Sequence, residues 1–142
     1  MSDNEIRSDI FRYRQVVSEE SIDVNGHVNN VAYVQWMQDV AVAHSRDRIE
    51  PGTTQRLGCT WVAREHRIEY LRPSFLGDEL EIHTWLDNIR RVRCRRVYEF
   101  FRPSDEQLLA KGETDWVFMN IESGRPVSIP KEISSAFAPK RG

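Results

Sequence analysis

The sequence has little of what marks several specialised classes of protein. Its 142 residues include only two cysteines, Cys59 and Cys94, whose separation matches no metal-binding or redox motif. No apolar run approaches the length of a membrane span, and the N-terminus lacks the apolar stretch of a signal peptide. Neither a phosphate-binding loop nor a dinucleotide fingerprint occurs. We therefore expect a cytoplasmic protein with two buried, reduced thiols, with no metal or cofactor and no membrane partner.

Charge of neither sign dominates the chain. The 20 basic and 22 acidic side chains leave a formal net charge of -2, so no overall field favours nucleic acid as a partner. A hydrophobic share of 39% with 30% charged residues is ordinary for a soluble globular protein. This length suits one domain, and we expect a single domain over residues 1–142, with its core at about 9–134 and a short C-terminal tail.

Residue periodicity predicts a strand followed by one long helix. Residues 11–18 alternate as a strand does, and residues 30–49 have helical spacing of apolar side chains. One face of this helix collects six residues, which are Tyr33, Trp36, Met37, Val40, Ala41 and His44. Because Val34, Val42 and two alanines make the remaining faces apolar or small, we expect the helix to be buried most of the way round. Proline and glycines at 50–58 end it.

From residue 60 to about 119 the pattern changes to that of a sheet. Long segments of alternating residues are joined by short polar connections, at 60–71, 79–86, 91–101 and 108–120. This pattern is typical of an antiparallel meander. A turn and a short helix starting near Pro130 follow. A helix this apolar needs a sheet curled around it, so we expect an α+β fold, with about five antiparallel strands around one central helix.

The stretch "SIDVNGHVNNVAYVQWM", residues 21–37, places an acid, three amides and a histidine before the helix. These residues are Asp23, Asn25, His27, Asn29 and Asn30. One interpretation is structural: Asn25-Gly26 is a common turn, aspartate is frequent in turns, and Asn29 or Asn30 suits a helix N-cap. The other interpretation is an active site at a helix N-terminus.

The element order and this loop resemble the hotdog-fold acyl thioesterases over roughly residues 9–134. "DVNGHVNNVAYVQWM" resembles the segment of acyl-ACP thioesterases in which Asp, Asn and His alternate ahead of "HVNN" and an aromatic residue. On that match Asp23, Asn25 and His27 take the three catalytic places. Asp23 also matches the essential aspartate of the 4-hydroxybenzoyl-CoA thioesterase-like branch, with Tyr33 in the helix that follows. "RIEYLRPSFLGDELEI" is similar to the family's second strand and its turn.

The chain departs from both branches. The bacterial acyl-CoA enzymes often have a glutamate early in the helix, where this chain has Gln38 and Asp39. The plant-type enzymes usually join two hotdog units, whereas this sequence has one. The resemblance therefore implies a thioester of either CoA or acyl carrier protein as the substrate.

Thioester hydrolysis needs a base or nucleophile and donors for the carbonyl oxygen. Asp23 can attack the carbonyl carbon or deprotonate a water that does. Asn25 would orient the carboxylate or the water, and His27 would act as a base or bind the carbonyl. Backbone N–H groups at a helix N-terminus are unpaired, so the oxyanion candidates are those around Asn29, Asn30 and Val31.

Four residues with rings are candidates for an acyl pocket, although core packing explains them equally well. They are Tyr33, Trp36, Trp61 and His66. In the strand predicted at 60–71, Trp61 and His66 have opposite parity, whereas Arg64 and His66 share a face. If that face is inward, both polar groups need partners, and reaching the active site from the dimer mate would explain their presence.

The run "RRVRCRRV" at residues 90–97 holds five arginines, which alternation divides between two strand faces. A solvated face with pairing to Glu79 and Glu81 across the hairpin explains most of them. Arg96 interrupts an otherwise apolar face. The functional interpretation is that Arg90 or Arg91, near the hairpin turn, binds a phosphate of CoA or phosphopantetheine.

Sheet edges are usually covered or paired, and the resemblance implies that two units join their sheets. We expect a homodimer or homotetramer, with a site combining Asp23 of one chain and helix-end amides of the other.

Two alternatives to a thioesterase remain. Hotdog enoyl-thioester hydratases have two residues between their Asn and His, where this chain has only Gly26. A non-catalytic acyl-thioester-binding module would not need the Asp23 constellation.

Overall fold

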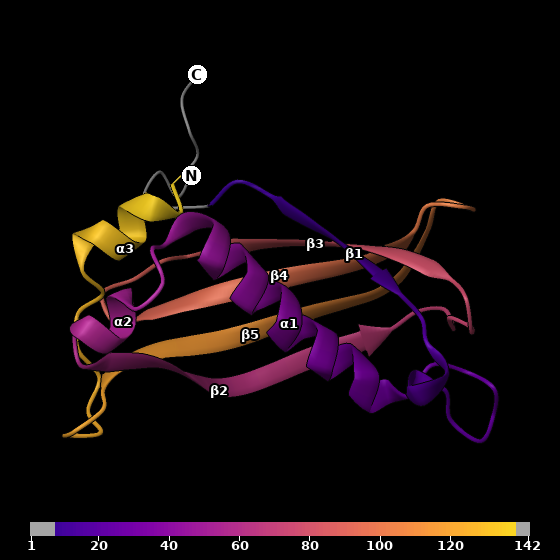
Figure 1. The fold of residues 1–142 in the computed structure, drawn as a ribbon, viewed down its shortest axis with the longest axis horizontal. Helices are drawn as coiled ribbons and strands as arrows, with labels where there is room; N and C mark the ends of the chain where they lie inside the picture. Colours follow the sequence, from indigo (N-terminus) through magenta and orange to yellow (C-terminus); the bar gives the residue numbers. More distant parts are fainter. Residues whose placement is uncertain (1–7, 139–142) are drawn as a thin grey trace.

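The computed structural model describes residues 8–138 as an antiparallel sheet packed against a long helix (Figure 1). The strands are β1 (Phe11–Val16), β2 (Cys59–Tyr70), β3 (Glu79–Asp87), β4 (Arg93–Arg102) and β5 (Gln107–Asn120). The helices are α1 (Asn30–Arg48), α2 (Thr53–Arg56) and α3 (Lys131–Ala136), with a 3-10 turn η1 at Glu19–Ser21. The predicted α+β architecture is confirmed, and α2 and η1 are additions to it. Residues 139–142 of the expected tail lie outside the described residues.

None of the helices within residues 8–138 combines the length and apolarity needed to cross a membrane.

The order of the strands across the sheet is β1-β3-β4-β5-β2, and all neighbours are antiparallel. The meander expected from the sequence is wrong for β2, which pairs with β5 and not with β3. Alternation indicates which face of a strand is buried, but it does not indicate the neighbouring strand. The segment 71–78 carries the chain from the β2 edge across the sheet to β3, and it passes beside the start of α1 (Figure 1).

The inner face of α1 and the sheet together form the core. The helix buries the six residues that its periodicity predicted: Tyr33, Trp36, Met37, Val40, Ala41 and His44. Facing them, the strands contribute Leu80, Ile82, Tyr98 and Phe100, all fully buried. Each large apolar side chain buried in this way contributes about 1.5–3 kcal/mol. Gly112 lets the helix approach closely, because a Cβ there would lie 3.2 Å from the Met37 Sδ.

The outer face of α1 differs from the sequence expectation. Val31 is 72% exposed and Val42 is 46% exposed, so the helix is not buried most of the way round in the single chain. The reason is that the sheet covers one side of the helix only (Figure 1). Val62 on the neighbouring edge strand β2 is exposed as well. An apolar strip along α1 and β2 is therefore open to solvent in the single chain.

Both cysteines behave as expected. Cys59 and Cys94 are buried free thiols. Burial raises the pKa of the Cys94 thiol to about 12, which keeps it protonated and unreactive.

Candidate active site

The loop before α1 is a closed turn. The Asp23 N–H donates to the His27 carbonyl at 2.8 Å, and the Gly26 N–H donates to the Asp23 carbonyl at 3.1 Å. Ile22 and Val28 on either side form an isolated antiparallel bridge. Gly26 has a φ of 75°, a left-handed conformation that glycine adopts without strain. The structural interpretation of Asn25-Gly26 as a turn is therefore correct.

The two oxygens of the Asp23 carboxylate lie in different environments. Oδ1 accepts hydrogen bonds from the backbone N–H groups of Asn25 at 2.9 Å and His27 at 3.2 Å. Oδ2 accepts no hydrogen bond from residues 8–138, and no cation in that range forms an ion pair with Asp23. Backbone donors thus hold the carboxylate in place, while one oxygen stays available to water or a substrate.

The other two proposed catalytic side chains lie on the surface of the same loop. His27 is exposed and lies edge-on against Phe75, with ring centroids 5.4 Å apart. Asn25 is exposed, and its backbone rather than its side chain contacts Asp23. The structure brings Asp23, Asn25 and His27 onto one turn, but within one chain it does not join their side chains into a hydrogen-bonded chain.

The N-terminus of α1 offers fewer oxyanion donors than expected. Asn29 is the N-cap: its side chain accepts from the Val31 N–H at 2.8 Å. The Asn29 N–H donates to the Ser21 carbonyl at 2.7 Å. Two of the three candidate N–H groups are therefore engaged, and the Asn30 N–H is the one without an acceptor in residues 8–138. The Asn30 carbonyl is fixed by the Tyr70 hydroxyl at 2.9 Å.

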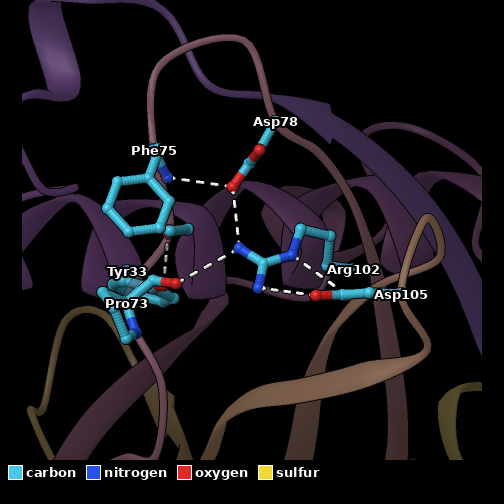
Figure 2. A network of polar contacts seen from close by, with 7 residues as sticks. Tyr33, Pro73, Phe75, Asp78, Arg102 and Asp105 are labelled. Carbon is cyan, nitrogen blue, oxygen red and sulfur yellow. Dashed lines mark hydrogen bonds and ion pairs between the residues drawn. The ribbon is translucent and has the colours of Figure 1, made fainter.

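The segment 71–78, part of which Figure 2 shows, contacts the end of the Asp23 loop and the start of α1. The Val28 N–H donates to the Ser74 carbonyl at 3.0 Å, and the Ser74 hydroxyl pairs with the Tyr33 hydroxyl at 2.6 Å. Burial raises the pKa of Tyr33, whose ring packs edge-on against Phe100 at 5.1 Å. Tyr33 is thus a core residue, and its hydroxyl holds the segment that supports the loop.

Arg102 holds this segment at its other end (Figure 2). Its Nη1 donates to the Asp78 carboxylate at 2.9 Å and to the Pro73 carbonyl at 3.3 Å, and its other two nitrogens donate to the Asp105 carboxylate. These carboxylates raise the pKa of Arg102. The Phe75 N–H also donates to Asp78, at 2.9 Å.

Sequence reasoning treated "RPSFLGD" only as the turn after a strand and missed this network. Pro73 and Gly77 do indicate a turn there. The partner Arg102, however, lies 24 residues beyond Asp78 along the chain, and no local pattern connects them.

A cavity of about 630 Å³ lies at the opposite end of α1, between that helix, α2 and the first half of β2. Its walls are mainly apolar and include Ile49, Trp61, Leu86, Trp116 and Phe137, together with Arg96. Of the four predicted pocket residues, only Trp61 lines it. Trp36 is a buried core residue that borders a smaller, more polar depression of about 450 Å³ beside Asn29 and Val31.

A bulge in β2 decides the position of His66. The pairing with β5 shifts between Ala63 and Glu65, so Trp61 lies opposite Phe118 and His66 opposite Thr114. One additional residue reverses the alternation, so Trp61 and His66 share the inner face despite their opposite parity. Arg64 lies within the bulge and has no paired residue on β5, so the regular alternation from which its face was expected is broken there. The His66 Nδ1 pairs with the Thr114 hydroxyl at 2.9 Å, so its partner belongs to its own chain.

The arginine run has mostly structural partners, but not the predicted ones. Glu79 and Glu81 pair with Arg14 and Arg12 of β1, because the register places Glu81 opposite Phe101 on β4. On the outer face of the sheet Arg93 pairs with Asp115, and Arg95 with Asp87 and Glu113. The solvated-face interpretation is therefore right about the kind of contact and wrong about the partners.

Arg90 and Arg91 lie at the β3–β4 hairpin, at the end of the sheet near α2 (Figure 1). Arg90 Nε donates to Asn88 at 3.2 Å, and Arg91 Nε donates to Ser128 at 3.2 Å. Both are exposed, and within one chain they lie at the far end from the Asp23 loop.

The architecture of one helix laid across an antiparallel sheet defines a hotdog-type protein. Solved structures of other proteins share it. A 1,4-dihydroxy-2-naphthoyl-CoA thioesterase from Synechocystis superposes with a TM-score of 0.83 at 18% identity, covering 91% of this chain and 96% of that one. A hypothetical protein from Staphylococcus aureus in complex with CoA gives 0.84 at 21% identity, covering 91% and 82%. The expected hotdog fold is confirmed.

Residues 17–137 match the model of the thioesterase-like superfamily, and the chain belongs to that family. Among curated proteins, oleoyl-acyl carrier protein thioesterase 1 from Arabidopsis thaliana is 24% identical over 129 residues, which is 90% of this chain. The chain spans 36% of the length of that relative.

Proposed function

We propose that this protein hydrolyses an acyl thioester of CoA or acyl carrier protein to a free acid and a thiol. The observation that carries the proposal is the Asp23 carboxylate, held by two backbone N–H groups through Oδ1 with Oδ2 unengaged. Membership of the thioesterase-like superfamily supports the reaction class. The CoA complex of one relative and the carrier-protein thioesterase among the others support either thiol carrier.

In the proposed reaction Asp23 removes a proton from water, and the resulting hydroxide adds to the thioester carbonyl carbon. The Asn30 N–H at the positive end of α1 would stabilise the negative oxygen that forms. The carbon–sulfur bond then breaks, and the thiolate leaves and takes up a proton. Direct attack by Asp23 would give an anhydride that water hydrolyses to the same products. In this proposal the Asn25 side chain orients the carboxylate or the water, and His27 acts as a base or binds the carbonyl.

A second copy of the chain would complete the site. The Asp23 loop lies at the start of α1 and the cavity lies near its end, and a helix of 19 residues spans about 28 Å. Within residues 8–138, no strand pairs with the outer edge of β2. Antiparallel pairing of two β2 edges about a two-fold axis would place Trp61 of one chain near Tyr70 of the other. Each cavity would then lie beside the partner's Asp23 loop.

The same pairing would bring the β3–β4 hairpin of one chain toward the Asp23 loop of its partner. We propose that Arg90 or Arg91 there binds a phosphate of the CoA or phosphopantetheine arm, because a guanidinium fork fits phosphate oxygens. This assembly is a homodimer, and a homotetramer built from two such dimers has the same sites.

The test is thiol release from short, long and aromatic acyl-CoAs and from acyl-carrier-protein thioesters, by wild type and Asp23→Ala. We expect the variant to lose about 100-fold in rate, the scale of a missing general base. Equal rates in both proteins would overturn the role of Asp23. Consumption of an enoyl thioester without thiol release would point to a hydratase, and tight binding without any turnover would point to a binding module.

A further inference from the structure

Arg96 is a buried guanidinium without a carboxylate partner. It lies on the inner face of β4, is 3% exposed and forms part of the cavity wall. Its Nη1 donates to the His44 Nδ1 at 2.9 Å and to the Thr84 hydroxyl at 3.1 Å. Neither acceptor carries a negative charge. Within residues 8–138 its Nε and Nη2 donate to no protein atom and no carboxylate forms an ion pair with it.

The other arginines of the same strand show that a guanidinium without a carboxylate partner is unusual in this sheet. Arg93 and Arg95 face outward and each pairs with an acidic side chain on an adjacent strand. Burying a charge without a counter-charge costs several kcal/mol, so buried charges in proteins are normally paired. On the inner face Arg96 lies between Leu86 of β3 and Thr114 of β5, and neither carries a charge.

His44 holds the guanidinium in one orientation. The imidazole stacks on Phe11 at 4.9 Å and packs edge-on against Phe137 at 5.1 Å, so it is fixed on both sides. Burial and the adjacent Arg96 and Arg48 charges lower the pKa of His44 to about 3, so it is neutral. Because the neutral imidazole accepts from Arg96 at its Nδ1, it holds the Arg96 Nη1 toward the helix. The Nε and Nη2 of the guanidinium remain available to a ligand.

The cavity has the size and composition of a small-molecule site. It is a partly open cavity of about 630 Å³ with a mainly apolar lining, in which Arg96 is the buried charge. An acyl group ending in a methyl would remove water from Arg96 and give its free N–H groups no acceptor. A carboxylate at that position would accept two parallel hydrogen bonds from the fork.

We propose that Arg96 makes this cavity selective for acyl groups that carry a carboxylate at the end remote from the thioester. The preferred substrates are thus half-thioesters of dicarboxylic acids. The inference rests on the proposed function, since it assigns the cavity to the acyl group. The exposed Arg46 also lines the cavity and is the natural control, because it places a second arginine charge there without burial.

The first experiment compares kcat/KM for thioesters of equal carbon number, such as adipoyl-CoA and hexanoyl-CoA. We expect wild type to prefer adipoyl-CoA and Arg96→Met to lower the adipoyl-to-hexanoyl ratio about 10- to 100-fold, the scale of a charged hydrogen-bonded pair. Arg46→Met should change the ratio by less than about threefold, as an exposed charge does. No preference in wild type, or its loss in Arg46→Met and not in Arg96→Met, would overturn the proposal.

The second experiment separates this inference from the proposed function. Free adipate should raise the Tm of wild type more than free hexanoate at the same concentration, and Arg96→Met should remove the difference. If no thioester is hydrolysed but this difference is present, the proposed function fails and the carboxylate site stands. Equal stabilisation of wild type by both acids would overturn the site, even if Arg96→Met does not fold.

Discussion

At the scale of single residues, Asp23 has two roles, and each of its two carboxylate oxygens serves one of them. Oδ1 closes the turn by accepting from the Asn25 and His27 N–H groups, and Oδ2 is open to the reaction. The sequence allowed two interpretations of this residue, as a turn former and as a catalytic carboxylate. They are compatible because different oxygen atoms serve the two roles.

Asn and Ala at position 23 should therefore separate stability from activity. Asp23→Asn keeps an oxygen that can accept from both N–H groups, so its unfolding free energy should stay within about 0.5 kcal/mol of wild type. Asp23→Ala leaves those donors without an acceptor and should cost about 1 kcal/mol. Urea unfolding measures the difference, and thiol release should fall in both variants. Full activity in Asp23→Asn would exclude a base or nucleophile role.

His44 should make the stability of the protein depend on pH. Its pKa is about 3 in the fold, compared with 6.5 for an exposed histidine, so the unfolded chain binds a proton that the folded chain does not. Unfolding free energy should therefore decrease as pH falls from about 6 to about 4, by about 1.4 kcal/mol per pH unit from this residue. Above about pH 6.5 the effect is absent.

His44→Asn is the matched variant, because an amide oxygen can still accept from Arg96 but cannot titrate. Urea unfolding of both proteins between about pH 7 and pH 4 should give a shallower decline for the variant. Parallel curves would show that His44 is protonated in the fold as readily as in the unfolded chain.

At the scale of elements, the segment 71–78 determines where the Asp23 loop lies. It contacts the loop through Ser74 and the helix through Tyr33, and Arg102 at the end of β4 holds its far end (Figure 2). This segment also makes the crossing from β2 to β3 that separates the observed sheet from a meander.

Loss of the Arg102 contacts should loosen this support. Arg102→Met leaves the part-buried Asp78 without its cation and should lower unfolding free energy by about 1 to 3 kcal/mol. Misplacement of the loop should reduce thiol release about three- to tenfold. The control is Arg14→Met, whose pair with Glu79 has a 72% exposed arginine side chain and should change stability by less than about 0.5 kcal/mol. Similar losses in both variants would contradict a positioning role.

At the scale of the whole molecule, the cavity and the Asp23 loop lie at opposite ends of α1. Among the described residues, no strand covers the β2 edge between them. The exposed Val42 and Val62 beside that edge are consistent with a surface that another copy covers. The proposed two-fold dimer makes two complete sites, each from both chains.

Mixed dimers test this arrangement directly. Asp23→Ala removes the acid, and Ala63→Trp should fill the cavity, which Ala63 lines. Each homodimer should be inactive. A dimer of one chain of each kind, purified through two different tags, should have one intact site and about half of wild-type activity. A mixed dimer as inactive as its parents would show that each site belongs to a single chain.

The sequence by itself determined the long helix, the strands and the buried faces of α1 and β3. The six-residue face of α1, the alternation in β3 and the turn at Asn25-Gly26 all follow from local chemistry, because helical and strand periodicity and glycine's conformational freedom act within a few residues. The Asp23 loop was recognisable for the same reason, since its residues are consecutive.

Only the tertiary structure decided which strands lie side by side and which side chains contact one another. β2 lies beside β5 because of long-range packing, and the bulge after Ala63 turns His66 to the inner face against its parity. The partners of the arginine run depend on a register set by the whole sheet, so Arg93 and Arg95 find carboxylates while Arg96 finds none. Such contacts join residues far apart in the chain, and their free energy depends on the burial and charge of the finished fold, which no local pattern contains.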